Sequence, residues 1–280
     1  MFDTIHMSVP FNISYNHDDE IIIHDDIYIK FNPAWNRLII NCSIPKLLYG
    51  NNLTEINKSD IEKFFTIVHN RIKELFHVEV HKDEWQVHRL DFCKNFKMES
   101  SKQVTQYIHI LSKIILPRKT TITYNNETVI YKNKSQSIQF YDKYKEIMKR
   151  KADYSLLQQS KNILRFEIQC KKDMLKQYSS KRKAVDLLTK EIYESVMNET
   201  LELINSKLEL IQDEYEISPN LFDLFGYSKL EKVFAFMYFI DQFGESFLKP
   251  IYSSSYYNRK KIVNEFKQAV EKKERMRLKL

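Results

Sequence analysis

Apolar and polar residues alternate over several short stretches in the first 175 residues of the chain. The stretches IIIHDDIYIKFNP and NRLIINCSIPKLLYG follow this period of two, with Pro33 and Pro45 as breaks, and predict strands that close on a loop at Gly50. The same alternation predicts strands in DEWQVHRLDFCKNF, TTITYNN, ETVIYKN, SQSIQFYDK and NILRFEIQCKK. A turn at Asn125 and Asn126 joins TTITYNN to ETVIYKN. This part of the chain is expected to be built on a sheet.

Apolar residues at helical spacing separate these stretches and dominate the rest of the chain. NKSDIEKFFTIVHNRIKELFHV predicts a helix capped by Ser59, and SKQVTQYIHILSKIILP predicts another that stops at Pro117. KYKEIMKRKADYSLLQQ also has helical character. From about residue 172 onward, KAVDLLTKEIYESVMNETLELINSKLELIQDEYEI, KVFAFMYFIDQF and SSSYYNRKKIVNEFKQAVEKKERMRLKL all predict helices. We therefore predict an α+β protein with a sheet domain at 1–175 and a helical region at 176–280.

Composition narrows the class of protein. The chain has 44 Lys and Arg against 37 Asp and Glu, a formal charge of +7 that favours polyanionic partners without requiring them. It has only 3 glycines, and neither a GxxxxGK[ST] nor a GxGxxG run is present, which argues against ATP and dinucleotide chemistry. The scattered cysteines Cys42, Cys93 and Cys170 predict reduced, buried thiols. No apolar run approaches about 18 residues, so we expect a cytoplasmic protein without a membrane span.

Three of the predicted strands carry functional groups on one face only. Simple alternation in the HRLDF strand sets Trp85, Val87, Arg89 and Asp91 opposite His88, Leu90 and Phe92. In the other two strands the polar faces consist of Gln139, Tyr141 and Lys143, and of Arg165, Glu167 and Gln169. If the three strands are neighbours in one sheet, two carboxylates, a tyrosine and several cations meet on one surface.

Such a surface is suited to phosphodiester transfer. Carboxylate oxygens select Mg²⁺ or Mn²⁺, arginine and lysine balance charge in the transition state, and a phenolate is a competent nucleophile and leaving group. Each strand also has a simpler explanation: Arg beside Asp or Glu is common in solvated cross-strand ion pairs, and a strand tyrosine usually packs. His81 and His88 beside the RLD strand are interpreted as core or surface residues rather than metal ligands.

The ordered set HRLDF, SIQFYDKYKE and LRFEIQCKKDM resembles the replication initiators of rolling-circle plasmids and filamentous-type phages, and IPKLLYGNN resembles a segment of the phage branch. The resemblance covers roughly residues 30 to 175 and, less distinctly, the C-terminal basic helix. It implies a five-stranded antiparallel sheet with helices on one face. It also implies a site-specific nick at a replication origin that leaves a 5′-phosphotyrosine and a free 3′-hydroxyl, later reversed to rejoin the strand.

By this resemblance Tyr141 is the nucleophile, and Asp91 and Glu167 hold the Mg²⁺ or Mn²⁺. Many relatives place a His-hydrophobe-His pair at the metal, and this chain has none, so the acidic variant of the site fits better. Arg89, Arg165 and Lys143 are expected to stabilise charge. Two neighbours of Tyr141 have open roles, since Tyr144 is an alternative nucleophile and Glu146 is either a site residue or a helix-surface charge.

DNA is the expected partner, as a single-stranded or hairpin origin, with a host helicase and a second copy of the chain as further candidates. The residues expected to contact DNA are Lys145, Tyr256, Tyr257, Arg259, Lys260 and Lys261. A solvated basic face is the alternative for the last five. Three other functions stay open at this point: a non-enzymatic DNA-binding regulator of the same fold, a metal-independent tyrosine recombinase, and an RNA-binding protein.

Overall fold

The computed structural model describes residues 1–11, 21–24, 27–150, 153–212, 224–271 and 278. The chain divides into two compact units, Met1–Lys207 and Leu208–Arg277, of which the first also includes Leu278. Our sequence-based boundary near residue 175 falls inside the first unit. The long helix after residue 175 packs on the sheet, and the first unit therefore extends to Lys207.

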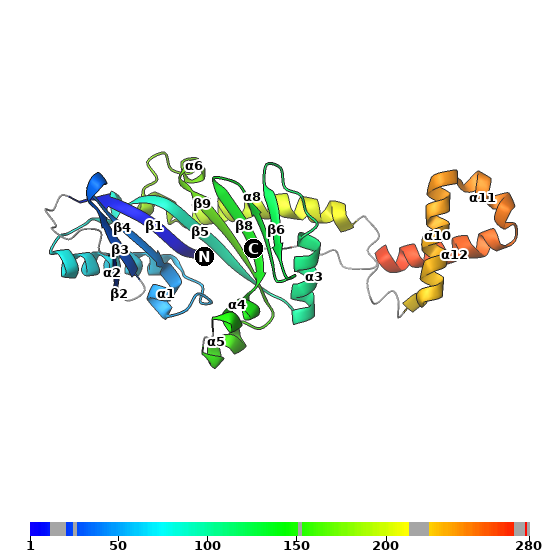
Figure 1. Cartoon of the computed structure of the whole chain (residues 1–280), viewed down its shortest axis with the longest axis horizontal. Helices are drawn as coiled ribbons and strands as arrows, with labels where there is room; N and C mark the ends of the chain where they lie inside the picture. Colours follow the sequence, from blue (N-terminus) through cyan, green and yellow to red (C-terminus); the bar gives the residue numbers. More distant parts are fainter. Residues whose placement is uncertain (12–20, 25–26, 151–152, 213–223, 272–277, 279–280) are drawn as a thin grey trace. The chain divides into compact units, whose positions relative to one another are not determined.

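The first unit is built on one antiparallel sheet, whose nine described strands have the order β2-β3-β4-β1-β5-β9-β8-β7-β6 (Figure 1). The strands are β1 (Phe2–Pro10), β2 (Ile21–His24), β3 (Ile27–Asn32), β4 (Arg37–Ser43), β5 (Gln86–Lys97), β6 (Thr120–Tyr124), β7 (Thr128–Lys132), β8 (Gln136–Asp142) and β9 (Ile163–Lys171). The α+β class and the antiparallel sheet are confirmed. The expected number of five strands is wrong, because an N-terminal strand and hairpins at both edges extend the sheet.

Strand β1 is an interior strand of the sheet, although the sequence analysis did not predict it. It pairs with β4 on one side and with β5 on the other. Ile5, Met7 and Val9 alternate along it and are fully buried, which is the period-two signal of a strand with one face on the core. A register shift between Phe2 and Ile5 places Asp3 on the opposite, open face, although it has the same parity as Ile5.

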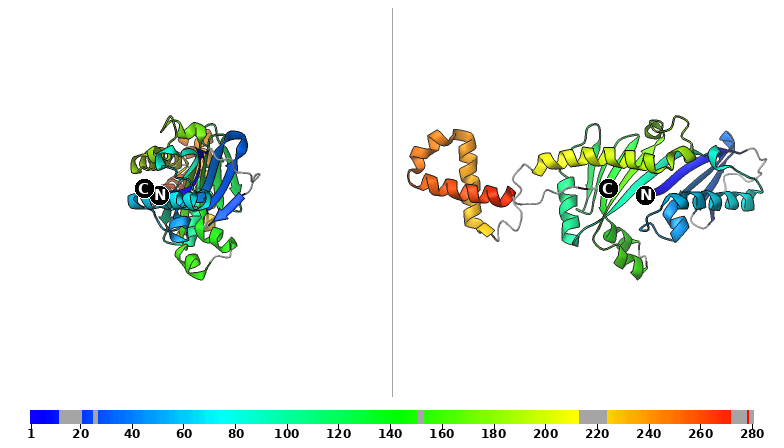
Figure 2. Two further views of the ribbon diagram at one scale, coloured as in Figure 1. Left: turned by 90° about the vertical axis from the view of Figure 1, so that its left-hand side faces the viewer. Right: turned by 180° about the vertical axis from the view of Figure 1, so that it is seen from behind.

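The helices of the first unit are α1 (Ile44–Tyr49), α2 (Lys58–Phe76), α3 (Ser101–Leu111), α4 (Lys143–Lys149), α5 (Tyr154–Gln159), α6 (Lys172–Leu175), α7 (Ala184–Leu187) and α8 (Lys190–Gln212). Helices α2, α3 and α8 cover one face of the sheet (Figure 2). Tyr193 of α8 packs edge-on against Phe2 and donates to the Cys93 carbonyl, and Phe76 of α2 packs edge-on against Phe11. The other face remains open at its centre, which is where the polar strand residues lie.

Local chemistry explains where the helices begin and how the β6–β7 hairpin turns. Asn57, not Ser59, caps α2, because its side chain accepts from the Asp60 amide while Asp60 accepts from the Asn57 amide. Helix α3 ends at Leu111, before the predicted stop at Pro117. The predicted hairpin turn is confirmed, with Asn125 and Asn126 both at positive φ (48° and 51°).

A β-bulge at His88 changes which residues of β5 face the core. His6 pairs with Arg89 and Met7 pairs with Val87, so His88 is an extra residue on β5. The bulge sends Val87 to the core and leaves both His88 and Arg89 on the open face, where the His88 ring bonds the Ser8 hydroxyl (2.6 Å). The strict alternation that placed His88 with Leu90 and Phe92 therefore fails at this residue.

We expect His88 to make the fold acid-sensitive. Burial first, then the positive charges of Lys172, Arg182 and Arg37 and the nearby His6 ring, lower the pKa of His88 to about 4. Because the folded pKa lies below the unfolded value, the contribution of His88 to stability is present above about pH 6.5 and is lost as the pH falls towards 4.

The measurement is the urea midpoint of the wild type and of His88→Gln at several pH values between these limits. The advantage of the wild type over the variant should shrink on acidification. His109→Gln, at an exposed histidine on α3, is the control and should behave like the wild type. A difference between wild type and His88→Gln that stays constant with pH would contradict the prediction.

The second unit is helical, as predicted. Its described helices are α10 (Tyr227–Phe243), α11 (Glu245–Tyr252) and α12 (Ser255–Glu271). They enclose a small core of Leu230, Val233, Phe236, Leu248, Tyr256, Val263 and Phe266. Within the part of the chain that the structure describes, no helix has the length and apolar character needed to cross a membrane.

Candidate active site

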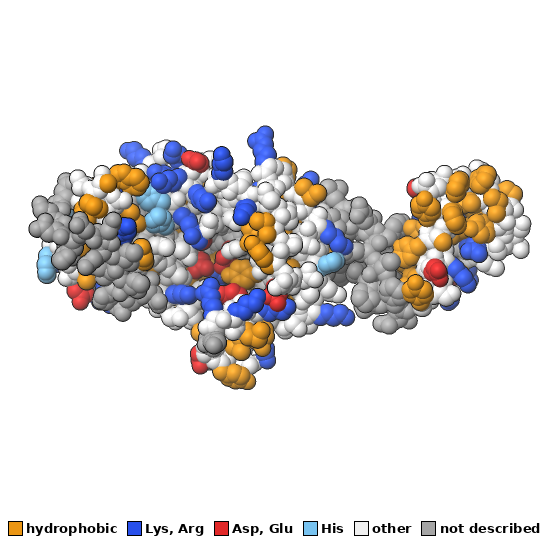
Figure 3. Space-filling view, in the orientation of Figure 1, with side chains coloured by type: hydrophobic (Ala, Val, Ile, Leu, Met, Phe, Trp, Pro, Cys, Tyr) orange, Lys and Arg blue, Asp and Glu red, His pale blue; other side chains and the backbone are white. Residues whose placement is uncertain are grey.

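Strands β5, β9 and β8 are neighbours, as the predicted site requires. Glu167 on β9 lies opposite Gln139 on β8, and Tyr141 lies opposite Arg165. Asp91, Tyr141 and Glu167 all line one cleft of about 450 Å³ on the open face. Figure 3 shows acidic side chains at the centre of this face with lysine and arginine side chains around them. The predicted convergence of these three residues is therefore present in the structure.

Tyr141 and Glu167 form the centre of the cleft. The Tyr141 hydroxyl donates to Glu167 Oε1 (2.7 Å), and Gln139 Nε2 donates to Glu167 Oε2 (2.6 Å). Burial, followed by the negative charge of Glu167, raises the pKa of Tyr141 well above 10. The hydroxyl is consequently protonated at neutral pH and is already bonded to a carboxylate that can accept its proton.

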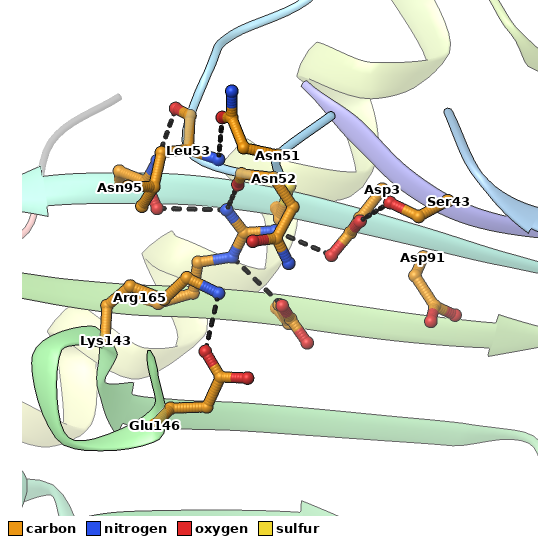
Figure 4. A network of polar contacts seen from close by, with 12 residues as sticks. Asp3, Ser43, Asn51, Asn52, Leu53, Asp91, Asn95, Lys143, Glu146 and Arg165 are labelled. Carbon is orange, nitrogen blue, oxygen red and sulfur yellow. Dashed lines mark hydrogen bonds and ion pairs between the residues drawn. The ribbon is translucent and has the colours of Figure 1, made fainter. Parts of the chain in front are cut away.

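Arg165 holds this carboxylate in place from within the protein. Its side chain is fully buried and donates from Nε to Glu167 Oε1 (3.0 Å) and from Nη2 to Asp3 Oδ2 (2.6 Å). Nη1 donates to the Asn52 carbonyl (2.6 Å) and to Asn95 Oδ1 (3.1 Å), which ties the 51–54 loop to the sheet (Figure 4). All three guanidinium nitrogens thus have protein partners, and Arg165 positions the carboxylates without lining the cleft.

Arg89 and Asp91 form a second ion pair on the same face. Arg89 donates two hydrogen bonds to the Asp91 carboxylate, from Nε to Oδ1 (2.9 Å) and from Nη2 to Oδ2 (2.5 Å). Burial, reinforced by the negative charges of Glu167 and Asp3, raises the pKa of Asp91 to about 6 although Arg89 opposes this. The three carboxylates are therefore near enough to repel one another.

This crowding bears on the divalent metal that the resemblance implies. Among the residues that the structure describes, no three His, Cys, Asp or Glu side chains are arranged as a ready metal-binding group. The donor chemistry nevertheless fits, because hard carboxylate oxygens suit Mg²⁺ or Mn²⁺. A cation would also favour the charged form of Asp91, which burial and then the negative charges of Glu167 and Asp3 disfavour. Asp91 and Glu167, the two predicted ligands, share the cleft with Asp3.

Helices α1 and α4 supply a basic rim to the cleft. Lys145, a predicted DNA contact, lines it next to Lys46, Lys149 and Arg150, which the sequence analysis missed. Lys143, by contrast, is fully buried and bonds Glu146 Oε2 (2.8 Å). Glu146 lines the cleft and also pairs with Arg150. Lys143, the lysine closest in sequence to Tyr141, therefore helps to hold the cleft residue Glu146 in place.

The structure also places the tyrosines nearest to Tyr141 in the sequence. Tyr131 lies on β7 with its ring fully buried in the core, and its hydroxyl donates to the Leu111 carbonyl. Tyr144 is half-buried on α4 and does not line the cleft. The three cysteines are free and buried, as predicted.

Asp3 is a further site residue that sequence reasoning missed. Its carboxylate accepts from Arg165 and from the Ser43 hydroxyl (2.8 Å) and lines the cleft. A β-bulge between Phe2 and Ile5 accompanies this placement. The only local signal was the alternation of Ile5, Met7 and Val9 just after it.

The predicted DNA-contacting residues of the C-terminal helix have unequal positions. Tyr256 belongs to the core of the second unit, 2% exposed, and its hydroxyl bonds Glu245 (2.8 Å). Lys260 pairs with both oxygens of Glu245 (2.6 and 2.9 Å), and the Arg259 guanidinium lies 4.6 Å from the centre of the Tyr252 ring. Tyr257 and Lys261 are exposed. Packing of α12 on its neighbours accounts for the burial of Tyr256.

Comparisons with known proteins identify the family of the chain. Residues 5–193 match the model of a phage protein family that is described as the N-terminal part of a replication-associated protein. No curated protein and no solved structure matches the chain. The matched span takes in the sheet except the first residues of β1, and it includes the three strands β5, β8 and β9 and the start of α8. The chain therefore belongs to this phage replication-associated protein family and is a replication initiation protein of the rolling-circle type, which acts on DNA.

Proposed function

We propose that this protein nicks and rejoins one DNA strand at a rolling-circle origin, with Tyr141 as the nucleophile. The observation that carries the proposal is the hydrogen bond from the Tyr141 hydroxyl to Glu167 in a cleft that Asp91 also lines. A tyrosine, a proton acceptor and a second carboxylate within one cleft are the groups that reversible strand transfer requires.

In the proposed reaction Tyr141 attacks a backbone phosphorus as Glu167 takes the phenolic proton. A bond forms between the Tyr141 oxygen and phosphorus, and the bond from phosphorus to the 3′ oxygen breaks. The 3′ oxygen leaves as a hydroxyl after it takes up a proton, and the 5′ phosphate remains on Tyr141. The phosphodiester energy is kept in this linkage, so the reverse attack by a 3′-hydroxyl rejoins the strand without a further energy source.

The cations of the site have two different tasks in this scheme. Arg89, Lys145 and the rest of the basic rim face the cleft and balance the charge of the phosphate. Arg165 and Lys143 are buried and act as positioning residues, since they hold Glu167 and Glu146. A positioned carboxylate costs little reorganisation at the moment of reaction.

Asp91 and Glu167, with Asp3 beside them, would hold Mg²⁺ or Mn²⁺ at this site. When bound, the ion would polarise a non-bridging phosphate oxygen as a Lewis acid. We propose single-stranded or hairpin DNA as the substrate form. A host helicase and a second copy of the chain stay predictions.

A covalent-adduct assay tests the proposal. The full chain is incubated with labelled single-stranded and hairpin oligonucleotides and Mg²⁺ or Mn²⁺, and protein-linked label is read on a denaturing gel. An adduct that forms with the metal and disappears in EDTA supports the proposal. Sequence-specific binding without adduct supports a regulator, cleavage that persists in EDTA supports a recombinase, and preference for RNA of equal sequence supports an RNA-binding protein.

We expect Asp91→Asn to lower the rate of adduct formation by about 10²-fold or more, because Lewis-acid catalysis contributes several kcal/mol. The Mn²⁺ concentration for half-maximal rate should rise in the same variant. Asp83→Asn, at an exposed carboxylate outside the cleft, is the matched control. An unchanged Mn²⁺ requirement in Asp91→Asn would exclude Asp91 as a ligand.

A further inference from the structure

A second group of cationic and imidazole side chains lies on the open face beside Arg89. We call it the Arg37 cluster; it consists of His6, Ser8, Arg37, His88, Lys172 and Arg182. Ser8 and the bulge hold it together, since Arg37 Nε donates to the Ser8 hydroxyl (2.7 Å), the same hydroxyl bonds His88 (2.6 Å), and the His6 and His88 ring centres are 5.4 Å apart. The nicking reaction described above uses none of these side chains.

The charges of the Arg37 cluster have one sign. Lys172, Arg182 and Arg37 all act on His88, and Arg89 and Lys172 both act on His6. Each of these effects, together with burial, lowers the pKa of the imidazole, so both rings are held neutral in a positive surrounding. A positive potential around two neutral imidazoles disfavours a metal ion and favours an anion.

The hydrogen bonding of the cluster is incomplete within the protein. His88 Nδ1 and Arg182 Nε are shielded from solvent and have no hydrogen-bond partner among the described atoms. Arg182 donates from Nη1 to the Val87 carbonyl (2.7 Å), which fixes its segment beside β5. Lys172, at the start of α6, is exposed and has its charge available to a ligand. Polar groups in this state are normally completed by a bound partner or water.

We propose that the Arg37 cluster is a second phosphate subsite, which binds a backbone phosphate of the DNA strand away from the phosphate attacked by Tyr141. The inference rests on the proposed nicking function and adds the path of the strand. Strand β5 connects the two places, because His88 and Arg89 are consecutive and Arg89 reaches Asp91 in the cleft. The DNA strand would then run along the open face from the cleft, which Asp3 and Ser43 line, towards Ser8 near the end of β1 and Arg37 at the start of β4. Figure 3 shows histidine side chains on this face with lysine and arginine side chains next to them.

The salt dependence of DNA binding tests the subsite. The full chain is titrated against a labelled oligothymidine of about 20 nucleotides, longer than one domain usually covers, over about 50 to 200 mM NaCl. Each single-strand phosphate contact contributes about 0.7 to the slope of log K against log salt. Lys172→Ala should therefore reduce the slope by about 0.7 and weaken binding about fivefold at 0.1 M salt, and Lys172→Arg should restore both.

Lys102→Ala is the matched control, because Lys102 is an exposed lysine at the start of α3, on the covered side of the sheet. It should leave slope and affinity as in the wild type. A slope for Lys172→Ala equal to that of the wild type, or an equal loss in Lys102→Ala, overturns the subsite.

The adduct assay on the wild-type protein keeps the two proposals apart. Adduct formation together with an unchanged slope in Lys172→Ala means that the subsite is wrong and the nicking function stands. A reduced slope with no adduct on any oligonucleotide means that the subsite stands as part of a DNA-binding protein that does not nick.

Discussion

Tyr141→Phe is expected to abolish the covalent protein–DNA product completely. Phenylalanine keeps the ring in the cleft and removes only the oxygen that would bond to phosphorus, so no residual linkage should form through this position. The variant also loses the hydrogen bond to Glu167, a neutral donor to a charged acceptor, which costs about 1.5–3 kcal/mol of stability at most. The readout is protein-linked label on a denaturing gel after incubation with oligonucleotide and Mn²⁺.

The neighbouring tyrosines provide matched controls. Tyr144→Phe removes a hydroxyl on α4 that lies outside the cleft and should retain the adduct. Tyr131→Phe removes a core hydroxyl that donates a hydrogen bond to the Leu111 carbonyl. This variant should retain the adduct and lose about 1 kcal/mol of stability. An adduct that persists in Tyr141→Phe and vanishes in one of these two would reassign the nucleophile.

Arg165→Met is expected to cause the largest loss of stability, about 3–5 kcal/mol. The side chain is fully buried and is the shared partner of Asp3, Glu167, Asn52 and Asn95. Its removal leaves two buried carboxylates without their counter-charge, and this uncompensated charge costs more than the lost hydrogen bonds. Both tryptophans belong to the first unit and Trp85 is buried, so its fluorescence during urea unfolding reports on this unit.

Two further variants show that the loss has this cause. Asp3→Asn in the Arg165→Met background should recover part of the stability, because it removes one of the two uncompensated buried charges. Lys190→Met breaks an exposed ion pair with Glu194 on α8 and should cost no more than about 0.5 kcal/mol. Equal losses in Lys190→Met and Arg165→Met, or no recovery in the double variant, would refute the explanation.

Much of the candidate site was predictable because strand alternation is a local property. Tyr141 and Gln139 share a face with each other, as do Arg165 and Glu167, and these side chains meet once β8 and β9 pair. For β5, the predicted faces of the side chains are correct from Arg89 onward and wrong for the residues before it. A bulge adds one residue to a strand, and alternation cannot reveal a bulge that depends on the pairing of β5 with β1.

The roles of the charged side chains were harder to predict from the sequence. Arg165 and Arg89 have the same residue type on the same face, yet one is fully buried and holds four groups while the other grips a single carboxylate at the cleft. Burial of this kind depends on the 51–54 loop and on β1, which are distant in the sequence. Tyr256 is a similar case in the second unit, because it was predicted to contact DNA at the surface but packs into the core.

By itself, the sequence determined the α+β class, the hairpin at Asn125 and Asn126, and the polar faces that carry Asp91, Tyr141 and Glu167, because each depends on short-range periodicity or turn chemistry. Only the tertiary structure decided that β1 lies between β4 and β5 inside the sheet, that Asp3 meets Arg165 across 162 positions of sequence, and that His88 joins Arg37 on the open face. These features arise from non-local strand pairing, whose register is fixed by the packing of the whole sheet on its helices.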